Sequence, residues 1–354
     1  MTRLSTNTGV ARRLVHLALL AGCIAAGQAH ARTADSLPAY QPEQVVSGPI
    51  RLWGHGSFKA DFMGNLVKAW GAGFARFHPA ARLENQMYGT ASAIGALYTG
   101  SGDIAILGEE ISPAAAAAFT RARNYPPLGI EIATGSVDVA FFDYAHMIFV
   151  HKDNPLDRLT LEQADAVFGA EHLRGKHNIR NWGQLGLKGE WAKQGITPYS
   201  WKDLDFSLFI QEAVMEGSHR WNNDLKEFAH IKPTDAPQYD HGKQILDALA
   251  NDRYGIAISN VRYANPNVKP LALARKTGGP YFTATPETLI SQQYPLTRII
   301  PAFVDRVPGQ PMDPKVREFL RYILSREGQQ DIVRTTGYLP LGEAAIRAQL
   351  RKLQ

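Results

Sequence analysis

From residue 50 onward the chain alternates predicted strands with predicted helices, and this alternation restricts its possible folds more than any other feature. Strands are predicted at 50–53, 82–87 and 103–107, and each leads through a short loop into a helical pattern. Consecutive strand–loop–helix units form a parallel sheet with right-handed crossovers. The sequence therefore predicts an α/β fold whose loops gather at the carboxyl ends of these strands, where open α/β sheets bind ligands.

The loops after these strands are short and rich in Gly, Ser or Thr. They read Gly-His-Gly-Ser at 54–57, Gly-Thr-Ala-Ser at 89–92 and Gly-Glu-Glu-Ile-Ser-Pro at 108–113. Ser112 is a predicted N-cap, with Pro113 at the first helical position. A single loop of this kind is an ordinary connection, but three in succession at helix N-termini favour a cleft suited to an anion.

Two strands predicted in immediate succession, at 137–142 and 145–151, interrupt the alternation. The interruption indicates a crossing into a second lobe, and a strand predicted at 297–304 returns the chain to the first. The predicted boundaries are 48–138 and 285–354 for lobe one and 139–284 for lobe two. Two crossings of this kind form a hinge, and we expect ligand binding to close it.

The N-terminus has the composition of an export signal. Three arginines and no acidic residue accompany an apolar run at 14–26, which is short for a membrane span. Ala-His-Ala at 29–31 fits the small-x-small rule, so we predict a signal peptide at 1–31 that is cleaved after Ala31. The polar residues 32–47 are then predicted to form a flexible leader, and the mature protein is placed in the periplasm.

An alternative lies within the same segment. Leu-Ala-Gly-Cys at 20–23 matches a lipobox, in which Cys23 would be lipidated and would anchor the protein to the cell envelope. Cys23 is the only cysteine, so the chain cannot form an internal disulfide.

The net charge does not indicate a nucleic-acid partner. The chain carries 38 basic and 33 acidic residues, a formal charge of +5. Residues 1–31 hold three of the basic residues and none of the acidic ones, which leaves +2 after cleavage. No run of Lys and Arg interleaved with aromatic residues occurs, and we expect no nucleic-acid binding.

Several short segments together resemble the periplasmic phosphate-binding receptors of ABC transporters. The matching segments are 148–156, 159–161, 167–169, 181–187, 254–257, 294–298, 328–330 and 337–341. Their order and spacing extend the resemblance over nearly the whole chain from about residue 50. It implies a type II periplasmic binding fold, in which each lobe is a mixed sheet flanked by helices and the ligand lies in a cleft between the lobes.

The resemblance also implies a ligand site, predicted to lie at these positions: Gly56, Ser57, Phe58, Thr90, Ala91, Glu109, Ser200, Lys202 and Asp203. Backbone N–H groups of residues 57, 58, 90 and 91 and the hydroxyls of Ser57 and Thr90 would donate hydrogen bonds to the anion. Glu109 would accept one from a protonated oxyanion, and the last three residues would approach from lobe two.

The sequence departs from the family at the fourth loop. The family's Arg followed by Ser-Gly-Thr is absent, and Tyr-Ser-Trp-Lys-Asp-Leu-Asp-Phe-Ser at 199–207 occupies the region. Replacing a bidentate guanidinium while adding Glu109 and Asp203 disfavours a dianion, because a buried carboxylate that faces phosphate costs several kcal/mol unless it is protonated or paired. Lys202 lies close enough in sequence to pair with such a carboxylate. The alternative is that Glu109 and Asp203 are ordinary solvated acidic residues of loops.

These features favour an exported solute-binding protein that captures phosphate or a related oxyanion for an ABC transporter or a sensor. A degenerate relative that serves as a partner-binding or scaffolding module is the alternative, motivated by the altered fourth loop. An enzyme is disfavoured, because no Gly-x-Ser-x-Gly elbow surrounds Ser57 and the single cysteine lies in the export signal. The histidines show no His-x-x-x-His pair on a helix, and we expect neither a metal nor a cofactor in what we predict to be a monomer.

Overall fold

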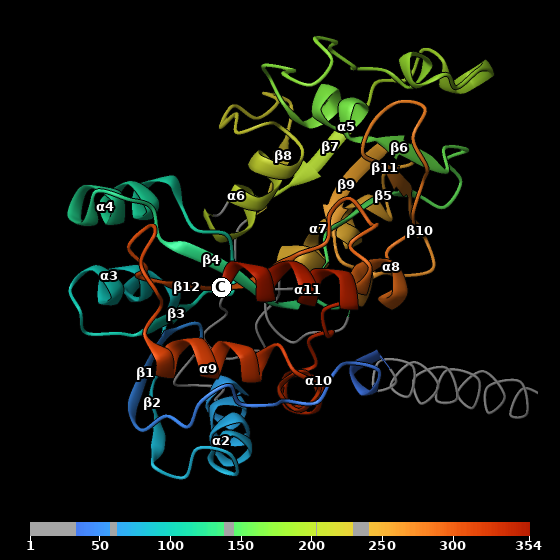
Figure 1. The fold of residues 1–354 in the computed structure, drawn as a ribbon. Helices are drawn as coiled ribbons and strands as arrows, with labels where there is room; N and C mark the ends of the chain where they lie inside the picture. Colours follow the sequence, from blue (N-terminus) through green and yellow to red (C-terminus); the bar gives the residue numbers. More distant parts are fainter. Residues whose placement is uncertain (1–32, 57–61, 138–144, 203, 229–240) are drawn as a thin grey trace, which may run out of the picture.

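The computed structural model has two lobes, each built on a five-stranded sheet (Figure 1). It describes residues 33–56, 62–137, 145–202, 204–228 and 241–354 of the 354-residue chain. The predicted signal peptide, the lipobox cysteine and most of the strand predicted at 137–142 lie outside the described residues. Within the described residues, no helix is both long enough and apolar enough to cross a bilayer.

The sheet of lobe one has the strand order β2-β1-β3-β12-β4. Three strands are parallel to one another, as predicted: β1 (Gly48–Gly54), β2 (Ala81–Gln86) and β3 (Ile104–Ile106). β12 (Ile299–Val304) runs antiparallel between β3 and β4 (Leu128–Thr134). The chain therefore returns to the middle of this sheet, as expected from the strand predicted at 297–304. β4 is not among the predicted strands.

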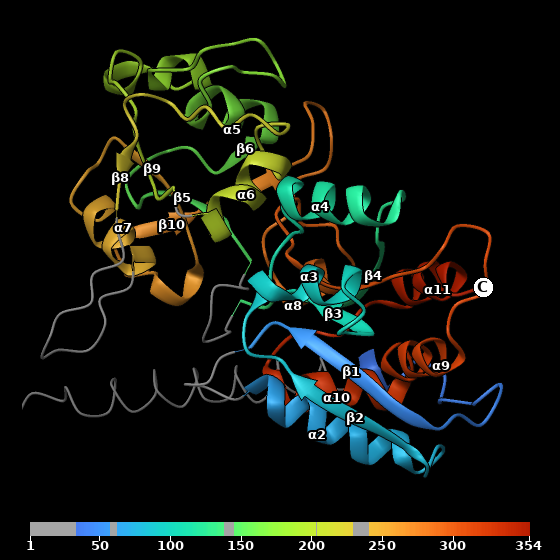
Figure 2. The same cartoon turned by 90° about the vertical axis from the view of Figure 1, so that its left-hand side faces the viewer.

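Helices cover both faces of this sheet. The helices that connect its first strands are α2 (Phe62–Ala75), α3 (Ala93–Tyr98), which the 3₁₀ turn η1 (Thr90–Ser92) precedes, and α4 (Pro113–Arg123). The C-terminal part adds α9 (Pro314–Ile323), α10 (Arg326–Thr336) and α11 (Glu343–Lys352). Figure 2 shows α2 and α10 side by side beneath β1 and β2, with α3 on the opposite face.

The sheet of lobe two has the order β10-β5-β9-β7-β8. Its strands are β5 (Met147–His151), β7 (Thr197–Ser200), β8 (Lys226–Glu227), β9 (Gly255–Ser259) and β10 (Val268–Pro270). A separate pair is formed by β6 (Arg158–Thr160) and β11 (Ala272–Ala274). The associated helices are α5 (Leu161–Phe168), α6 (Leu204–Ala213), α7 (His241–Leu249) and the short turns η2 (Trp182–Leu185), η3 (Gly189–Trp191) and η4 (Val261–Tyr263). Helix α8 (Pro286–Ile290) lies in the segment that leads back to β12.

Residues 33–47, predicted to be a flexible leader, instead pack against the C-terminal helices of lobe one. Leu37, Tyr40 and Val46 are buried in the main core. The Tyr40 hydroxyl donates to Glu318 of α9, and the Tyr40 amide donates to Glu327 of α10, each at 2.5–2.8 Å. These contacts join residues 278 and 287 positions apart, so local composition gave no indication of them.

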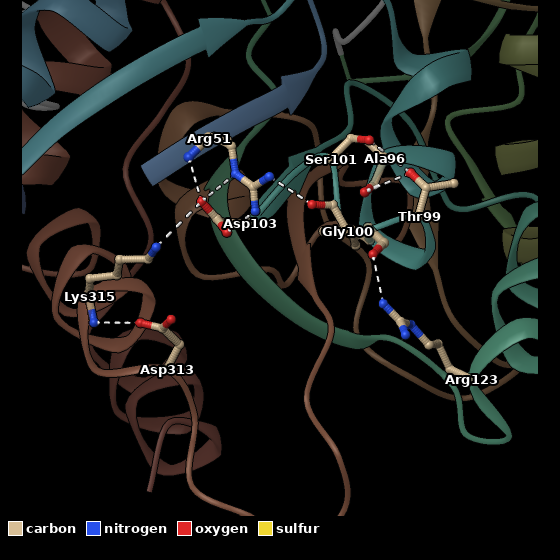
Figure 3. A network of polar contacts seen from close by, with 10 residues as sticks. Arg51, Ala96, Thr99, Gly100, Ser101, Asp103, Arg123, Asp313 and Lys315 are labelled. Atoms are coloured by element: carbon tan, nitrogen blue, oxygen red, sulfur yellow. Dashed lines mark hydrogen bonds and ion pairs between the residues drawn. The ribbon is translucent and has the colours of Figure 1, made fainter. Parts of the chain in front are cut away.

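A network of polar contacts joins β1 to the turn before β3 (Figure 3). The Arg51 guanidinium donates to both carboxylate oxygens of Asp103, at 2.8 and 3.1 Å, and to the Gly100 carbonyl at 2.7 Å. Backbone hydrogen bonds between Arg51 and Asp103 reinforce the pair, and the Lys315 ammonium of α9 lies 4.0 Å from the same carboxylate. The network fixes the register of β1 and β3, and with it the loops at their carboxyl ends.

Candidate ligand-binding cleft

Hydrogen bonds draw together the three loops at the carboxyl ends of β1, β2 and β3. The His55 amide donates to the Ile106 carbonyl at the end of β3, at 2.7 Å. The Gly89 amide, beyond the end of β2, donates to the Gly54 carbonyl at 2.8 Å. The first loop therefore lies between the other two, in agreement with the strand order β2-β1-β3.

Two glycines permit this close approach. A Cβ on Gly54, whose φ is +126°, would lie 2.0 Å from the Ile106 carbonyl oxygen. A Cβ on Gly56, whose φ is +154°, would lie 2.0 Å from the Met87 carbonyl oxygen. Only glycine avoids both the clash and the strained backbone at these positions. Gly56, predicted as a ligand contact, thus has a structural reason to be glycine in this fold.

A cavity of about 760 Å³ lies between the two lobes. Its described lining comprises Thr90, Ala91, Ile94, Leu107, Glu109, Glu110, Ile111, Ser112, Pro113, Ala114 and Ala115 from lobe one, and Lys202, Ser207, Leu208, Gln211, His219 and Trp221 from lobe two. Figure 2 shows α4 of lobe one facing α6 of lobe two at this place. The cavity therefore brings together four of the predicted site residues, namely Thr90, Ala91, Glu109 and Lys202.

The other predicted site residues are placed differently or not described. Gly56 and Ser200 are not among the lining residues. Ser200 is the last residue of β7 and is fully buried, and its hydroxyl has no hydrogen-bond partner within the described part of the chain. Ser57, Phe58 and Asp203 lie outside the described residues, so their predicted contacts stay predictions.

The N-terminus of α4 forms one wall of the cavity. Ser112 is its N-cap, as predicted, and the Ser112 hydroxyl accepts a hydrogen bond from the Ala115 amide at 3.1 Å. Residues 112–115 all line the cavity. The first-turn amides and the helix dipole give this wall a partial positive charge.

Formal charges of both signs line the cavity. Glu109 and Glu110 follow β3, and Lys202 is the one lysine or arginine among the described lining residues. The Lys202 ammonium lies 3.4 Å from a carboxylate oxygen of Glu227 on β8, and both side chains are exposed. An exposed pair of this kind contributes little stability, so Lys202 can turn toward a bound anion at small cost.

No family model matches the chain, but individual proteins do. The phosphate-binding protein PstS of Pseudomonas aeruginosa (strain PAO1) is 29% identical over 345 residues, which cover 97% of this chain and 98% of the relative. The protein of the same name from strain UCBPP-PA14 gives the same values. The chain is a homologue of these phosphate-binding proteins.

A solved structure shows the same fold. The crystal structure of PstS from Borrelia burgdorferi matches with a TM-score of 0.54 at 14% identity, and the match covers 83% of this chain and 99% of that one. The likeness at this identity concerns the fold alone. This likeness agrees with the two mixed sheets, flanked by helices, of the present chain.

In this homologue of phosphate-binding proteins, a buried arginine for which the sequence predicted no role contacts Glu110 of the cavity wall. Arg298, which precedes β12, is 1% exposed. Its guanidinium donates to the Gly108 carbonyl at 3.2 Å and lies 3.3 Å from a carboxylate oxygen of Glu110. It also lies 3.0 Å from Nε2 of His146 and 5.1 Å from the ring centre of Phe209 on α6. Arg298 thus contacts elements of both lobes.

The protonation state of His146 follows mainly from its burial. Burial, and secondarily the charge of Arg298, hold the pKa of His146 well below its ordinary value. His146 is therefore neutral near pH 7. A guanidinium has no acceptor, so the unprotonated Nε2 of His146 accepts the hydrogen bond from Arg298.

Sequence reasoning missed Arg298, His219 and Trp221 as residues of this region. Arg298 lies in the resembling segment 294–298, which was a usable signal, but its burial depends on partners up to 190 residues away. Nδ1 of His219 lies 2.7 Å from the side-chain oxygen of Gln211, and both residues line the cavity. Trp221 also lines the cavity, although its side chain is 7% exposed. The described ranges contain no group of three or more His, Cys, Asp or Glu side chains arranged to hold a metal.

Proposed function

We propose that this chain binds phosphate or a related oxyanion reversibly in the cavity between its lobes, and delivers it to an ABC transporter or a sensor. One observation carries the proposal: the cavity gathers Thr90, Ala91, Glu109 and Lys202, which the family resemblance implies as ligand contacts. The relatives from Pseudomonas aeruginosa are named for phosphate binding, and the similarity covers almost the whole of both chains.

The chemistry of the lining supports an anion that carries a proton. The Thr90 hydroxyl and the Ala114 amide in the first turn of α4 supply donors, and Lys202 supplies positive charge. The Glu109 carboxylate is a hydrogen-bond acceptor. A protonated oxygen of the oxyanion can donate to it, whereas an oxygen without a proton cannot. We therefore propose that the site prefers a singly protonated phosphate to sulfate, which has no proton near neutral pH.

Calorimetric titration tests the site. The wild-type protein is titrated at pH 7 with phosphate and with sulfate, alongside Lys202→Gln, Glu109→Gln and the control Lys243→Gln. Lys243 is an exposed α7 lysine that pairs with Asp247 and does not line the cavity. We expect Lys202→Gln to weaken phosphate binding about tenfold, which corresponds to about 1.4 kcal/mol, and Lys243→Gln to change it less than twofold. We expect Glu109→Gln to narrow the preference for phosphate over sulfate.

Two results would contradict the proposal in different ways. Phosphate binding that is unchanged in both Lys202→Gln and Glu109→Gln would place the site elsewhere. The absence of heat with phosphate, with sulfate and with organic oxyanions would favour the scaffold alternative, for which the pairing of Lys202 with Glu227 and the two glutamates of the cavity are the supporting observations.

We further propose that the chain is exported to the periplasm and that residues 1–31 are removed. The arginines and the apolar run before Ala31 support export, and the homologues' role in solute binding is consistent with it. Mass spectrometry of the mature protein is expected to find Arg32 at the N-terminus. A diacylglyceryl group on Cys23 would instead show the lipoprotein form.

A further inference from the structure

Much of the cavity between the lobes is apolar. Lobe one contributes Ile94, Leu107 and Ile111, and lobe two contributes Leu208 and Trp221. Ile94 and Leu107 are almost fully buried, whereas Ile111 and Leu208 are half-buried and remain available for contact. Apolar side chains from both lobes thus face the same space as Thr90, Glu109 and Lys202.

With the lobes placed as they are in this structure, the cavity is also large for an inorganic anion. Phosphate consists of one phosphorus atom and its oxygens, and every oxygen requires polar partners. A volume of about 760 Å³ lies instead within the range of roughly 300–1,000 Å³ that is typical of sites for drug-sized organic ligands. Such sites combine a mostly apolar wall with a few polar groups that fix orientation. The lining described here has that composition.

We propose that the preferred ligand is an organic oxyanion: a phosphonate or phosphate monoester that carries an apolar substituent. This inference rests on the proposed function, because the oxyanion is held by the same groups, Thr90, the first turn of α4 and Lys202. The substituent contacts Ile111 and Leu208, which lie on opposite lobes. Burying it removes apolar surface of both ligand and protein from water, and that burial adds to the affinity for the oxyanion.

A ligand series with a constant head group separates the substituent from the oxyanion. Calorimetry at pH 7 compares phosphate, methylphosphonate and phenylphosphonate with the wild-type protein. We expect phenylphosphonate to bind at least tenfold more tightly than methylphosphonate, because the two differ in the apolar group while sharing the same phosphonate head group. We expect the heat-capacity change on binding to be more negative for phenylphosphonate.

Substitutions then locate the substituent. Ile111→Gln and Leu208→Gln are each expected to weaken phenylphosphonate binding about tenfold while changing methylphosphonate binding less than twofold. Val307→Gln is the matched control, because Val307 is an exposed aliphatic residue, 49% accessible, that does not line the cavity. Circular dichroism verifies that each variant is folded, and if one is not, the wild-type ligand series decides alone.

Each outcome bears on a different claim. Phosphate binding with phenylphosphonate no tighter than methylphosphonate would overturn this inference and leave the proposed function intact, because the apolar walls would then only meet each other on closure. Phenylphosphonate binding without phosphate binding would support the inference and restrict the ligands to organic ones. No binding of any of the three would overturn both.

Discussion

Asp103 is the residue at which sequence, geometry and pH dependence can be connected most directly. Its carboxylate lies before β3 and accepts hydrogen bonds from the Arg51 side chain and amide. Burial opposes the ionisation of Asp103, but the hydrogen bonds from Arg51 outweigh it, so the pKa of Asp103 lies below its ordinary value. A carboxyl group with a lowered folded-state pKa stabilises the fold above its unfolded-state pKa, and this contribution is lost as the pH falls through the folded value.

We expect Asp103→Asn to lower the free energy of unfolding by about 1.5–3 kcal/mol at pH 7, the range for hydrogen bonds to a charged group. The difference from wild type should narrow below about pH 4, where the carboxyl of the unfolded chain becomes protonated. Urea unfolding at pH 7 and pH 3 measures both values. Glu84→Gln is the control, because Glu84 forms a more exposed pair with Arg82 on β2 of the same sheet. A difference that is equal at both pH values would show that the Asp103 charge does not stabilise the fold.

At the scale of elements, the ends of β1 and β3 must approach closely for the cleft loops to meet. Gly54 is the position that permits this, because a Cβ there would meet the Ile106 carbonyl oxygen at 2.0 Å. That oxygen is backbone and also accepts the His55 amide, so it cannot move without separating the strands. The three loops on which the cavity depends would then separate.

We expect Gly54→Ala to lower the free energy of unfolding by about 3 kcal/mol or more, because the substitution combines a positive φ with overpacking against backbone atoms. Gly278→Ala is the matched control: its φ is +77°, but nothing lies within 4 Å of the added Cβ, so only the cost of the left-handed backbone conformation, about 1–2 kcal/mol, applies. Thermal unfolding followed by circular dichroism measures both. Equal losses of stability in the two variants would show that β1 and β3 do not approach each other closely at Gly54.

Locally encoded elements were predictable from the sequence, and those that depend on distant partners were not. The parallel strands β1, β2 and β3 and the Ser112 cap follow from short patterns. The packing of residues 33–47 depends on Glu318 and Glu327, far along the chain, and local polarity therefore suggested a flexible leader. Arg298 is buried for the same reason, through partners that only the returning chain brings together.

Of the predicted site, Thr90 and Ala91 follow β2, Glu109 follows β3, and Lys202 follows β7 of the other sheet; all four line one cavity between the lobes. The apolar share of the lining could not be predicted, because it arises where α4 and α6 of different lobes face each other. Ile111 and Leu208 lie almost a hundred positions apart, and no sequence period relates them.

For the whole molecule, we propose that the lobes are interleaved in sequence, with boundaries near 138 and 285. The first sheet includes β12 between β3 and β4, whereas all strands of the second sheet lie within residues 147–270. A fragment of residues 33–137 therefore lacks a central strand and the helices α9 to α11. A fragment of residues 145–284 contains every strand of its own sheet.

We expect the 145–284 fragment to fold alone and the 33–137 fragment to remain unfolded, because a sheet without its central strand exposes apolar surface and unpaired backbone groups. Circular dichroism and cooperative thermal unfolding distinguish the two states. Fusing residues 285–354 to 33–137 through a flexible linker is expected to restore folding. Cooperative unfolding of 33–137 by itself would contradict the interleaved boundaries.

The central claim is that an oxyanion binds between the lobes, against the first turn of α4. Crystals grown with arsenate, a phosphate analogue whose arsenic is located by anomalous scattering, test this directly. We expect one arsenic peak with its oxygens within hydrogen-bonding distance of Thr90 and of the Ala114 amide in the first turn of α4. A peak at another place, in protein that calorimetry shows to bind arsenate, would contradict the account.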